Sequence, residues 1–258
     1  MPRGAKKNSV GAPVPRGTIG RRGRRHSAGT PQAEAENVAP GESSNLVYSR
    51  RRLKAVAARW DAKAADWDQN LRDPDCHLNE DQAYARFVAC LRKVIRSRKA
   101  FCSRNGIIDA GCGTGLVLDE IASSFAWGLG IDISPEMIAA AKKKSIKRAR
   151  FKIVDCFRLH RVRPKAGAVV SRGVLLSHYG PAHAGALLRA ARAALRRGGF
   201  IVFDFLNARG RRRSTHQAEN KTWFTAGQIR ALAGRAGFRQ VQVLGEAQRR
   251  VRLLVAES

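Results

Sequence analysis

Hydrophobic residues recur along this chain at two spacings, one typical of helices and one typical of buried strands. Apolar positions three or four residues apart predict amphipathic helices at about 56–72, 80–96, 116–125, 135–144, 182–197 and 225–236. Short apolar runs bounded by glycine or acidic residues predict strands at about 106–110, 127–131, 150–154, 166–171, 200–205, 240–244 and 251–255. The alternation of strands and helices favours a doubly wound, parallel α/β sheet, in which the last two strands form an antiparallel pair at one edge.

The domain organisation follows from where this pattern begins. Residues 1–45 contain no aromatic residue and no leucine, so burial cannot offset the entropy of ordering them, and we predict a disordered basic tail. Residues 46–99 are predicted to form N-terminal helices that cap a pocket, and residues 100–258 to form the ligand-binding α/β domain. Four interpretations of the tail stay open: a polyanion-binding arm, an idle tail, a start site placed too far upstream, and an organelle transit peptide.

The chain of 258 residues has a formal charge of +29, from 49 Lys and Arg against 20 Asp and Glu. Residues 1–45 hold only eight of the basic residues and three of the acidic ones, so the folded part is itself basic. Such a charge favours contact with RNA or another polyanion. The alternative is that arginine is simply spread over solvated faces.

The cysteines and the apolar runs bear on the cellular compartment. Five cysteines without a C-x-x-C pair indicate free thiols rather than a zinc site or a disulfide framework. The chain has no run of eighteen apolar residues and no secretory signal. We therefore expect a cytoplasmic protein.

The most informative stretch joins the first predicted strand to the following helix and has glycines at 111, 113 and 115. Glycine leaves no side chain where backbone must approach a ligand, and a helix start presents free N–H groups. The spacing differs from the dinucleotide fingerprint, because the position of its third glycine holds Leu116. We interpret the stretch as a ligand-binding turn, with a plain tight corner as the alternative.

Three aspartates end three of the predicted strands, in a chain that is poor in acidic residues. They are Asp109, Asp132 and Asp155, and the carboxyl ends of parallel strands meet at the sheet edge where open α/β sheets bind ligands. Asp132 is placed to accept both hydroxyls of a ribose. Carboxylates favour a cationic, nucleoside-like ligand over a phosphate. S-adenosylmethionine fits, since it has an ammonium, a sulfonium, a ribose diol, an adenine amino group and no phosphate.

From about residue 56 to its end, the chain resembles the class I S-adenosylmethionine-dependent methyltransferases, especially those that act on small molecules. The matching segments are IIDAGCGTG at 107–115, GIDISPEMI at 130–138, VDC at 154–156, AVVS at 168–171, LRRGGFIVFD at 195–204 and the stretch 224–238. The resemblance implies a Rossmann-like seven-stranded sheet of order 3-2-1-4-5-7-6 with the last strand antiparallel. It also implies S-adenosylmethionine as cofactor and no metal.

The resemblance further implies which residues hold the cofactor. Asp109, with the glycine turn, would hold the methionine end, Asp132 the ribose hydroxyls and Asp155 the adenine amino group. The residues directly after Asp132 and Asp155 would contact the adenine faces, and the end of the fourth strand would lie beside the methionine portion. The implied cofactor-binding set is Asp109, Gly111, Cys112, Gly113, Gly115, Asp132, Ile133, Met137, Asp155, Cys156, Ser171 and Arg172.

Methyl transfer is an in-line displacement, so positioning supplies much of its acceleration, and a base is needed only where the acceptor must lose a proton. His178, just after the fourth predicted strand, is the candidate general base, because imidazole titrates near neutrality. The alternative is a polar residue that leads the next helix. The candidate substrate-lining residues are Tyr179, Trp60, Trp67 and Tyr84, with helix packing as the alternative for the last three.

Three hypotheses stay open for the function. The chain has no Asn/Asp-Pro-Pro-Tyr tetrapeptide and no Pro-Cys nucleophile, which disfavours methylation of nucleic-acid bases. The leading hypothesis is methyl transfer to an O, N or C atom of a small molecule enclosed by the N-terminal helices and the loop at 209–223. The second is an RNA or RNA-bound acceptor, contacted by the tail and the arginines from Arg209 to Arg213. The third is a non-catalytic basic binding module, which the intact glycines and aspartates disfavour. No membrane partner is expected.

Overall fold

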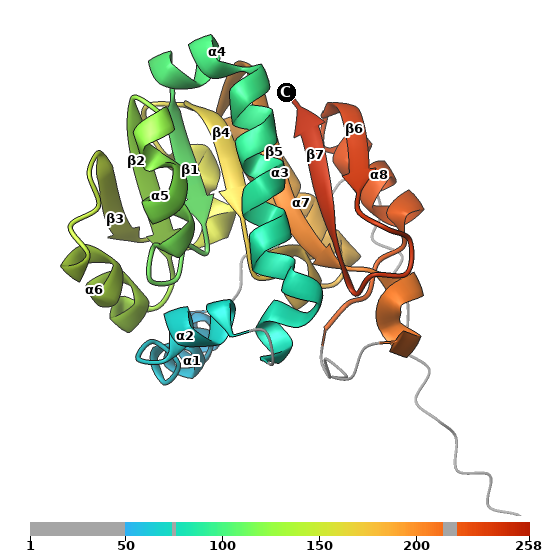
Figure 1. Ribbon diagram of the computed structural model, residues 1–258, viewed down its shortest axis with the longest axis horizontal. Helices are drawn as coiled ribbons and strands as arrows, with labels where there is room; N and C mark the ends of the chain where they lie inside the picture. Colours follow the sequence, from blue (N-terminus) through green and yellow to red (C-terminus); the bar gives the residue numbers. More distant parts are fainter. Residues whose placement is uncertain (1–49, 74–75, 214–220) are drawn as a thin grey trace, which may run out of the picture. The chain divides into compact units, whose positions relative to one another are not determined.

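The computed structural model describes residues 50–73, 76–213 and 221–258, so the predicted tail at 1–45 lies outside the described residues. Within these ranges seven strands form one sheet of order β3-β2-β1-β4-β5-β7-β6, with β7 antiparallel to both of its neighbours (Figure 1). The predicted Rossmann-like fold is therefore confirmed. The strands are β1 (Gly106–Ala110), β2 (Trp127–Asp132), β3 (Ala149–Ile153), β4 (Ala166–Ser171), β5 (Leu195–Leu206), β6 (Arg239–Leu244) and β7 (Val251–Glu257).

Helices cover both faces of this sheet (Figure 1). The α-helices are α1 (Arg50–Asp61), α2 (Trp67–Arg72), α3 (Ala83–Ser97), α4 (Lys99–Arg104), α5 (Leu116–Ile121), α6 (Pro135–Lys143), α7 (Pro181–Ala194) and α8 (Ala226–Arg235). Short 3-10 helices connect them: η1 (His77–Gln82), η2 (Ala122–Ser124), η3 (Cys156–Arg161), η4 (Leu175–His178) and η5 (Ala208–Arg213).

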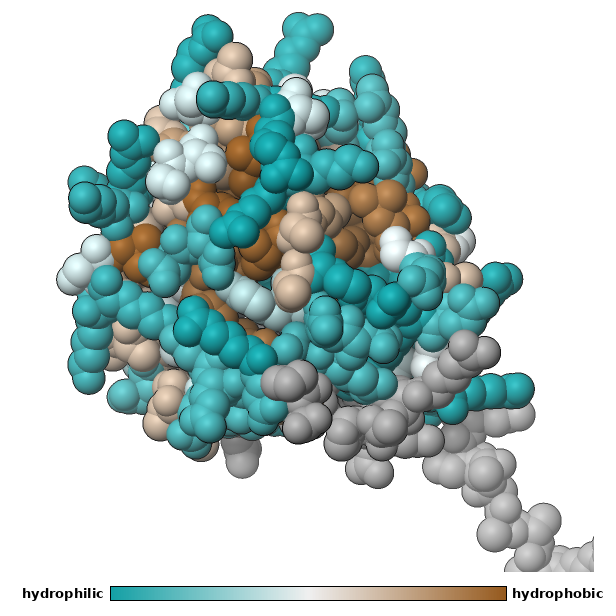
Figure 2. Space-filling view, in the orientation of Figure 1, coloured by the Kyte–Doolittle hydropathy of each residue, from teal (hydrophilic) through white to brown (hydrophobic). Residues whose placement is uncertain are grey.

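The two faces have separate cores because side chains alternate along each strand. In β1, Ile107 packs with Phe87 of α3 on one face, while the next residue, Ile108, packs with Leu187 of α7 on the other. All four side chains have 0% exposure. The outer surface is polar by contrast, and Figure 2 shows hydrophilic side chains over most of the face that it presents.

The first predicted helix is two helices in the structure, which corrects the prediction of a single helix at 56–72. After α1 the chain turns through hydrogen bonds from Lys63 N to Trp60 O and from Ala64 N to Asp61 O, at 3.0 and 3.2 Å. The Oδ1 atom of Asp61 accepts from the hydroxyl of Ser134, at 2.5 Å, and so ties the end of α1 to the start of α6.

Other helix boundaries also differ from the prediction. The second predicted helix starts at Ala83 rather than at residue 80, because Asp81 and Gln82 have φ of 60° and 54°. The helix predicted at 116–125 ends at Ile121 and continues as η2. The helix predicted at 182–197 ends at Ala194, because residues 195–206 join the sheet as β5. A register shift opposite β4 accompanies Gly198, which has φ of +75°.

Candidate active site

The turn after β1 is held in shape by hydrogen bonds to β2. The amides of Gly111 and Cys112 both donate to the carbonyl oxygen of Ile131, at 2.8 and 2.9 Å. The amide of Gly113 donates to Oδ2 of Asp132, at 2.9 Å. These bonds attach the turn to the end of the neighbouring strand and bring two of the predicted motifs together.

Two glycines of this turn are required for both backbone conformation and space. Gly113 and Gly115 have φ of +52° and +82°, in the left-handed region that side chains rarely adopt. A Cβ at Gly113 would lie 2.7 Å from Nε1 of Trp67, and one at Gly115 would lie 2.9 Å from the ring of Phe151. The turn therefore fits closely under α2 on one side and against β3 on the other.

A pocket with a volume of about 290 Å³ opens beside the turn, at the carboxyl ends of the central strands. Side chains of α1 and α2 form the wall of the pocket that faces the sheet edge. Most of the residues predicted for the site line it: Gly111, Gly113, Asp132, Ile133, Met137, Asp155, Cys156, Arg172, His178, Tyr179, Trp60 and Trp67. The topology thus brings together residues that are more than a hundred positions apart in the chain.

Four residues predicted to bind the cofactor, Asp109, Cys112, Gly115 and Ser171, are buried and not among those that line this pocket. The hydroxyl of Ser171 donates to the carbonyl oxygen of Ala110, at 2.7 Å, which joins the ends of β4 and β1. Cys112 packs against the strands, with its Sγ atom 3.4 Å from the carbonyl oxygen of Gly113. These residues support the turn from the side away from the pocket.

Tyr84, predicted as a substrate-lining residue, does not line this pocket either. It lies on the buried face of α3, and its hydroxyl donates to the carbonyl oxygen of Leu116, at 3.3 Å. Burial raises the pKa of this phenol well above its usual range. The structure therefore places Tyr84 in the contact between α3 and α5, which was the alternative interpretation.

The carboxylates at the strand ends differ in how well the protein satisfies them. Asp132 accepts from the amides of Gly113 and Ser134, at 2.9 and 3.0 Å. One oxygen of Asp155 accepts from the amide of Phe157, at 3.0 Å, whereas its Oδ2 atom is buried and has no hydrogen-bond partner within the described residues. Asp132 and Asp155 both line the pocket.

Asp109 is the least satisfied carboxylate in the described part of the chain. It is 1% exposed, and neither of its oxygens has a hydrogen-bond partner among the described residues. Burial raises the pKa of Asp109 to about 8, and the nearby charges of Asp132 and Asp204 add to this effect. A buried acceptor without a donor is costly, so a positive charge bound in the adjacent pocket would stabilise the ionised form of this carboxyl.

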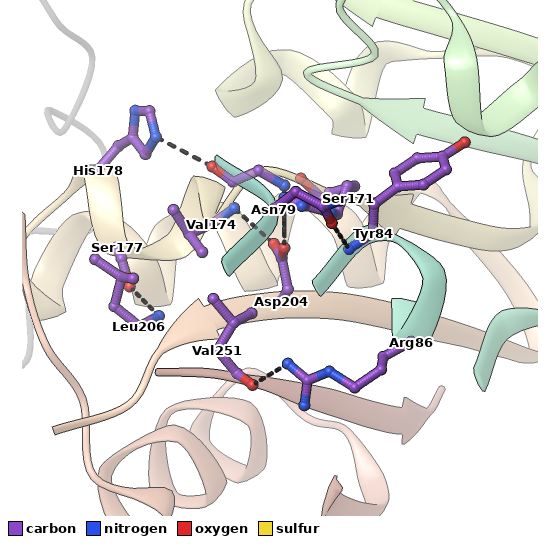
Figure 3. Close-up of polar contacts among 12 residues, drawn as sticks. Asn79, Tyr84, Arg86, Ser171, Val174, Ser177, His178, Asp204, Leu206 and Val251 are labelled. Atoms are coloured by element: carbon purple, nitrogen blue, oxygen red, sulfur yellow. Dashed lines mark hydrogen bonds and ion pairs between the residues drawn. The ribbon is translucent and has the colours of Figure 1, made fainter. Parts of the chain in front are cut away.

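Arg172, at the end of β4, forms a buried ion pair with Asp204 of β5, with 3.3 Å between Nη1 and Oδ2. The carboxylate of Asp204 also accepts from the amides of Gly173 and Val174, at 3.1 and 2.6 Å (Figure 3). Val174 has φ of +54°, which is a strained conformation for a β-branched residue. Asp204 therefore holds the loop that forms one side of the pocket.

Aromatic rings form a large part of the pocket wall. The rings of Trp60 and Trp67 meet edge to face, with 5.6 Å between centroids. His178 stacks on Trp60 at a centroid distance of 5.3 Å and an interplanar angle of 27°. Tyr179 lies beside Cys156, with 3.8 Å between hydroxyl and sulfur. These rings present flat, largely apolar surfaces to the pocket.

The environment of His178 determines its protonation state. Its Nε2 atom lies 3.2 Å from the carbonyl oxygen of Gly173 and donates to it, because a carbonyl can only accept (Figure 3). Burial lowers the pKa of His178 to about 3, and the charge of Lys221 contributes to the shift. The ring is therefore neutral at physiological pH, with its lone pair on Nδ1.

The structure adds pocket residues that the sequence analysis did not single out: Leu53, Val56, Arg59, Val154, Gly173, Leu175 and Lys221. Val56, Arg59 and Trp60 share one helical face by their spacing, so the hydrophobic pattern that located Trp60 could also have indicated Arg59. Lys221 comes from the connection before α8, and no local signal marks it. Burial lowers the pKa of Lys221 to about 7, and the charge of Arg59 contributes.

Within the residues that the structure describes, no group of three or more His, Cys, Asp or Glu side chains is arranged to hold a metal ion. None of their helices combines the length and the apolar character needed to cross a membrane.

Comparison with protein families gives a match over the central part of the chain. Residues 107–199 match a family model described as a methyltransferase domain. A segment of 62 residues is 40% identical to a protein of Schizosaccharomyces pombe named uncharacterized methyltransferase C70.08c. The match spans about a quarter of each protein, at 24% of this chain and 24% of the relative.

Solved structures of the same fold include methyltransferases. Magnesium protoporphyrin IX methyltransferase (ChlM) from Synechocystis PCC 6803, with bound SAH, is similar with a TM-score of 0.62 and 18% identity, over 79% of this chain and 98% of that one. The chain in the DhpI-SAM-HEP complex is similar with a TM-score of 0.61 and 18% identity, over 82% of this chain and 100% of that one. At such identities the likeness concerns the fold.

Proposed function

Because residues 107–199 match a family model described as a methyltransferase domain, we propose that the protein is a class I S-adenosylmethionine-dependent methyltransferase that transfers a methyl group to an O, N or C atom of a small-molecule acceptor. The observation that carries the proposal is the set of incompletely satisfied carboxylates at the sheet edge. Buried oxygens of Asp109 and Asp155 lack donors within the described residues. S-adenosylmethionine offers donors of the right kind, an ammonium, two hydroxyls and an amino group.

The residues of the pocket fit this cofactor. Asp132 would hold the ribose hydroxyls and the free oxygen of Asp155 the adenine amino group, while Asp109 supports the methionine end. Ile133 and Cys156 line the pocket between these carboxylates and provide apolar contacts for the adenine ring. The bound cofactor supplies an electrophilic methyl group on a sulfonium, and the protein's part is to align it with the acceptor.

A small acceptor is supported by the walls of the pocket. Helices α1 and α2 place the edge-to-face pair of Trp60 and Trp67 in the wall of the pocket, where these rings would contact an acceptor. A volume of about 290 Å³ is at the small end of the range of ligand pockets. A nucleic-acid strand would need an open groove instead, so these walls favour a compact molecule.

His178 is better suited to positioning than to proton removal. Its pKa of about 3 makes it a weak base at neutral pH, and a proton on the ring would add to the positive charge of Lys221. The neutral ring can accept a hydrogen bond on Nδ1 and so orient the acceptor. We therefore propose this role for His178 in place of the predicted general base.

The cofactor part of the proposal is tested by calorimetric titration of S-adenosylmethionine and S-adenosylhomocysteine into the purified protein, with NAD as a control ligand. We expect micromolar affinity for the first two ligands and no binding of NAD. Asp155→Asn removes a charge without adding bulk and should weaken binding at least about tenfold. The matched control is Asp119→Ala, at an exposed position on α5, which should bind as the unaltered protein does.

The acceptor part is tested separately, by measuring transfer of labelled methyl groups to a panel of small molecules and to total RNA. Turnover on small molecules supports the proposal. Transfer to RNA alone would overturn the choice of acceptor, and failure of the unaltered protein to bind either cofactor form would overturn the activity itself.

A further inference from the structure

The pocket is lined by side chains of both charges. Asp132 and Asp155 are acidic, whereas Arg59 of α1 and Lys221 before α8 are basic. The carboxylates match the cationic cofactor of the proposed function. The basic residues have no such explanation, because the cofactor carries no phosphate.

Two cationic side chains lie over one ring of the pocket wall, and a third lines the same pocket. The Nζ atoms of Lys63 and Lys221 lie 5.3 and 5.9 Å from the centroid of the Trp60 ring. Arg59 precedes Trp60 on α1 and lines the pocket. The cations come from two separate segments, residues 59–63 at and just after the end of α1 and the connection before α8, and the fold brings Lys63 and Lys221 together over one indole.

These cations are not neutralised by acidic side chains within the described residues. None of Arg59, Lys63 and Lys221 forms an ion pair there, although Arg250, which is also nearby, pairs with Glu80 at 3.4 Å. The charges that act on Lys221 come from Arg59, Lys63 and Arg250, and all of them lower its pKa. An anion bound among these groups would relieve their mutual repulsion.

From this arrangement, and resting on the proposed function, we infer that the methyl acceptor is an anionic small molecule with a flat apolar body, whose carboxylate or phosphate group is held by Lys221, Arg59 and Lys63. The apolar body would lie among the rings of Trp60, Trp67 and Tyr179, which line the same pocket. Lys221 is the central contact, since it is half-buried while Arg59 and Lys63 are exposed.

The test uses ligands of one shape and different charge. Benzoate and phenyl phosphate are compared with neutral benzamide by ligand-observed NMR titration of the full chain saturated with S-adenosylhomocysteine. We expect at least one of the two anions to bind about tenfold or more tightly than benzamide. Lys221→Met should reduce this preference to within about threefold, whereas Lys221→Arg should retain it.

The matched control is Lys165→Met, an exposed lysine directly before β4 and so at the opposite end of that strand from the pocket. It removes the same charge and should leave the preference unchanged. Affinity for the anion should also fall as pH rises through about 7, because Lys221, which faces the cations Arg59, Lys63 and Arg250, then loses its proton while His178 stays neutral.

Three results would overturn the inference. The first is equal affinity for the anions and benzamide, and the second is no binding of either anion at concentrations up to about 10 mM. The third is an equal loss of the preference for the anion in Lys221→Met and Lys165→Met. Normal binding of S-adenosylhomocysteine to each variant separates these outcomes from failure of the proposed function. A melting temperature close to that of the unaltered protein shows that Lys221→Met has folded.

Discussion

Trp60 and His178 stack face to face across the pocket, with 5.3 Å between their ring centroids, although they are separated by more than a hundred residues in the chain. The contact joins α1 to η4, and therefore joins the helices before the sheet to the loop after β4. The indole excludes water from one face of the imidazole. This burial, more than any charge, keeps the pKa of His178 at about 3.

Removing the indole of Trp60 should therefore expose the His178 imidazole to water and raise its pKa. We expect Trp60→Ala to raise the pKa of His178 from about 3 to between about 5 and 6, because water reaches the ring while the cations of Lys221 and Arg59 still oppose protonation. The shift is measured by NMR titration of the histidine Cε1 proton, assigned with His178→Gln. The control is Trp223→Ala, since Trp223 contacts Arg211 and Arg250 rather than His178. An unchanged pKa of His178 in Trp60→Ala would show that the stacking on Trp60 does not lower this pKa.

Gly113→Ala should destabilise the protein by about 2 to 4 kcal/mol. The added methyl would lie 2.7 Å from Nε1 of Trp67, and φ of +52° is unfavourable for alanine. The matched control is Gly234→Ala in α8, where a Cβ meets nothing within 4 Å and alanine is the better helix former. We expect that control to stabilise by about 0.5 to 1 kcal/mol. Urea unfolding measures both, and equal effects of the two changes would contradict the steric argument.

Asp109→Asn tests the buried carboxylate at the end of β1. With a folded-state pKa of about 8, Asp109 binds its proton more tightly when folded than when unfolded. Its contribution to stability is therefore present at low pH and is lost as pH rises toward 8. Asparagine mimics the protonated form, so the cofactor-free variant should be more stable than the unaltered protein at pH 8, by about 1 to 3 kcal/mol, and nearly equal to it at pH 4.

The same variant should bind S-adenosylhomocysteine at least about tenfold more weakly, because a ligand ammonium bound at the turn after β1 would favour the ionised carboxylate of Asp109, and the amide cannot ionise. Thermal melts between pH 4 and pH 9, with and without ligand, measure both effects. A variant that loses stability at pH 8 would indicate that the carboxylate is satisfied by the protein itself.

The sheet and the glycine turn could be predicted from the sequence because their signals are local. Apolar runs that end in Asp109, Asp132 and Asp155 mark strands, and glycines at fixed spacing mark the turn that needs left-handed backbone. The order of the strands needed the family resemblance, since no local pattern tells one parallel neighbour from another.

What could not be predicted depends on contacts between distant segments. The break after α1 is accompanied by a hydrogen bond from Ser134 to Asp61, and Gly198 lies in the register shift where β5 pairs with β4. Lys221 is an ordinary lysine in the sequence, and only the fold brings it to Trp60. Tyr84 could not be assigned to core or pocket, because both locations present the same helical spacing.

Asp204 holds the loop that carries Gly173, and removing its carboxylate should affect both stability and the site. Asp204→Ala leaves the buried guanidinium of Arg172 without this carboxylate and releases the amides of Gly173 and Val174. We expect a loss of about 3 to 5 kcal/mol in the free energy of unfolding, because one partner of a buried ion pair has been removed.

The variant should also free the carbonyl oxygen of Gly173 that accepts from His178, so the resonance of the His178 Cε1 proton should broaden or shift. Urea unfolding measures the loss of stability, and NMR measures the change in the His178 resonance. Asp119→Ala, at an exposed position, serves as control and should change stability by no more than about 0.5 kcal/mol. A stable Asp204→Ala with an unchanged histidine signal would mean that Val174 keeps its strained backbone without Asp204, and that the loop is shaped by η4 instead.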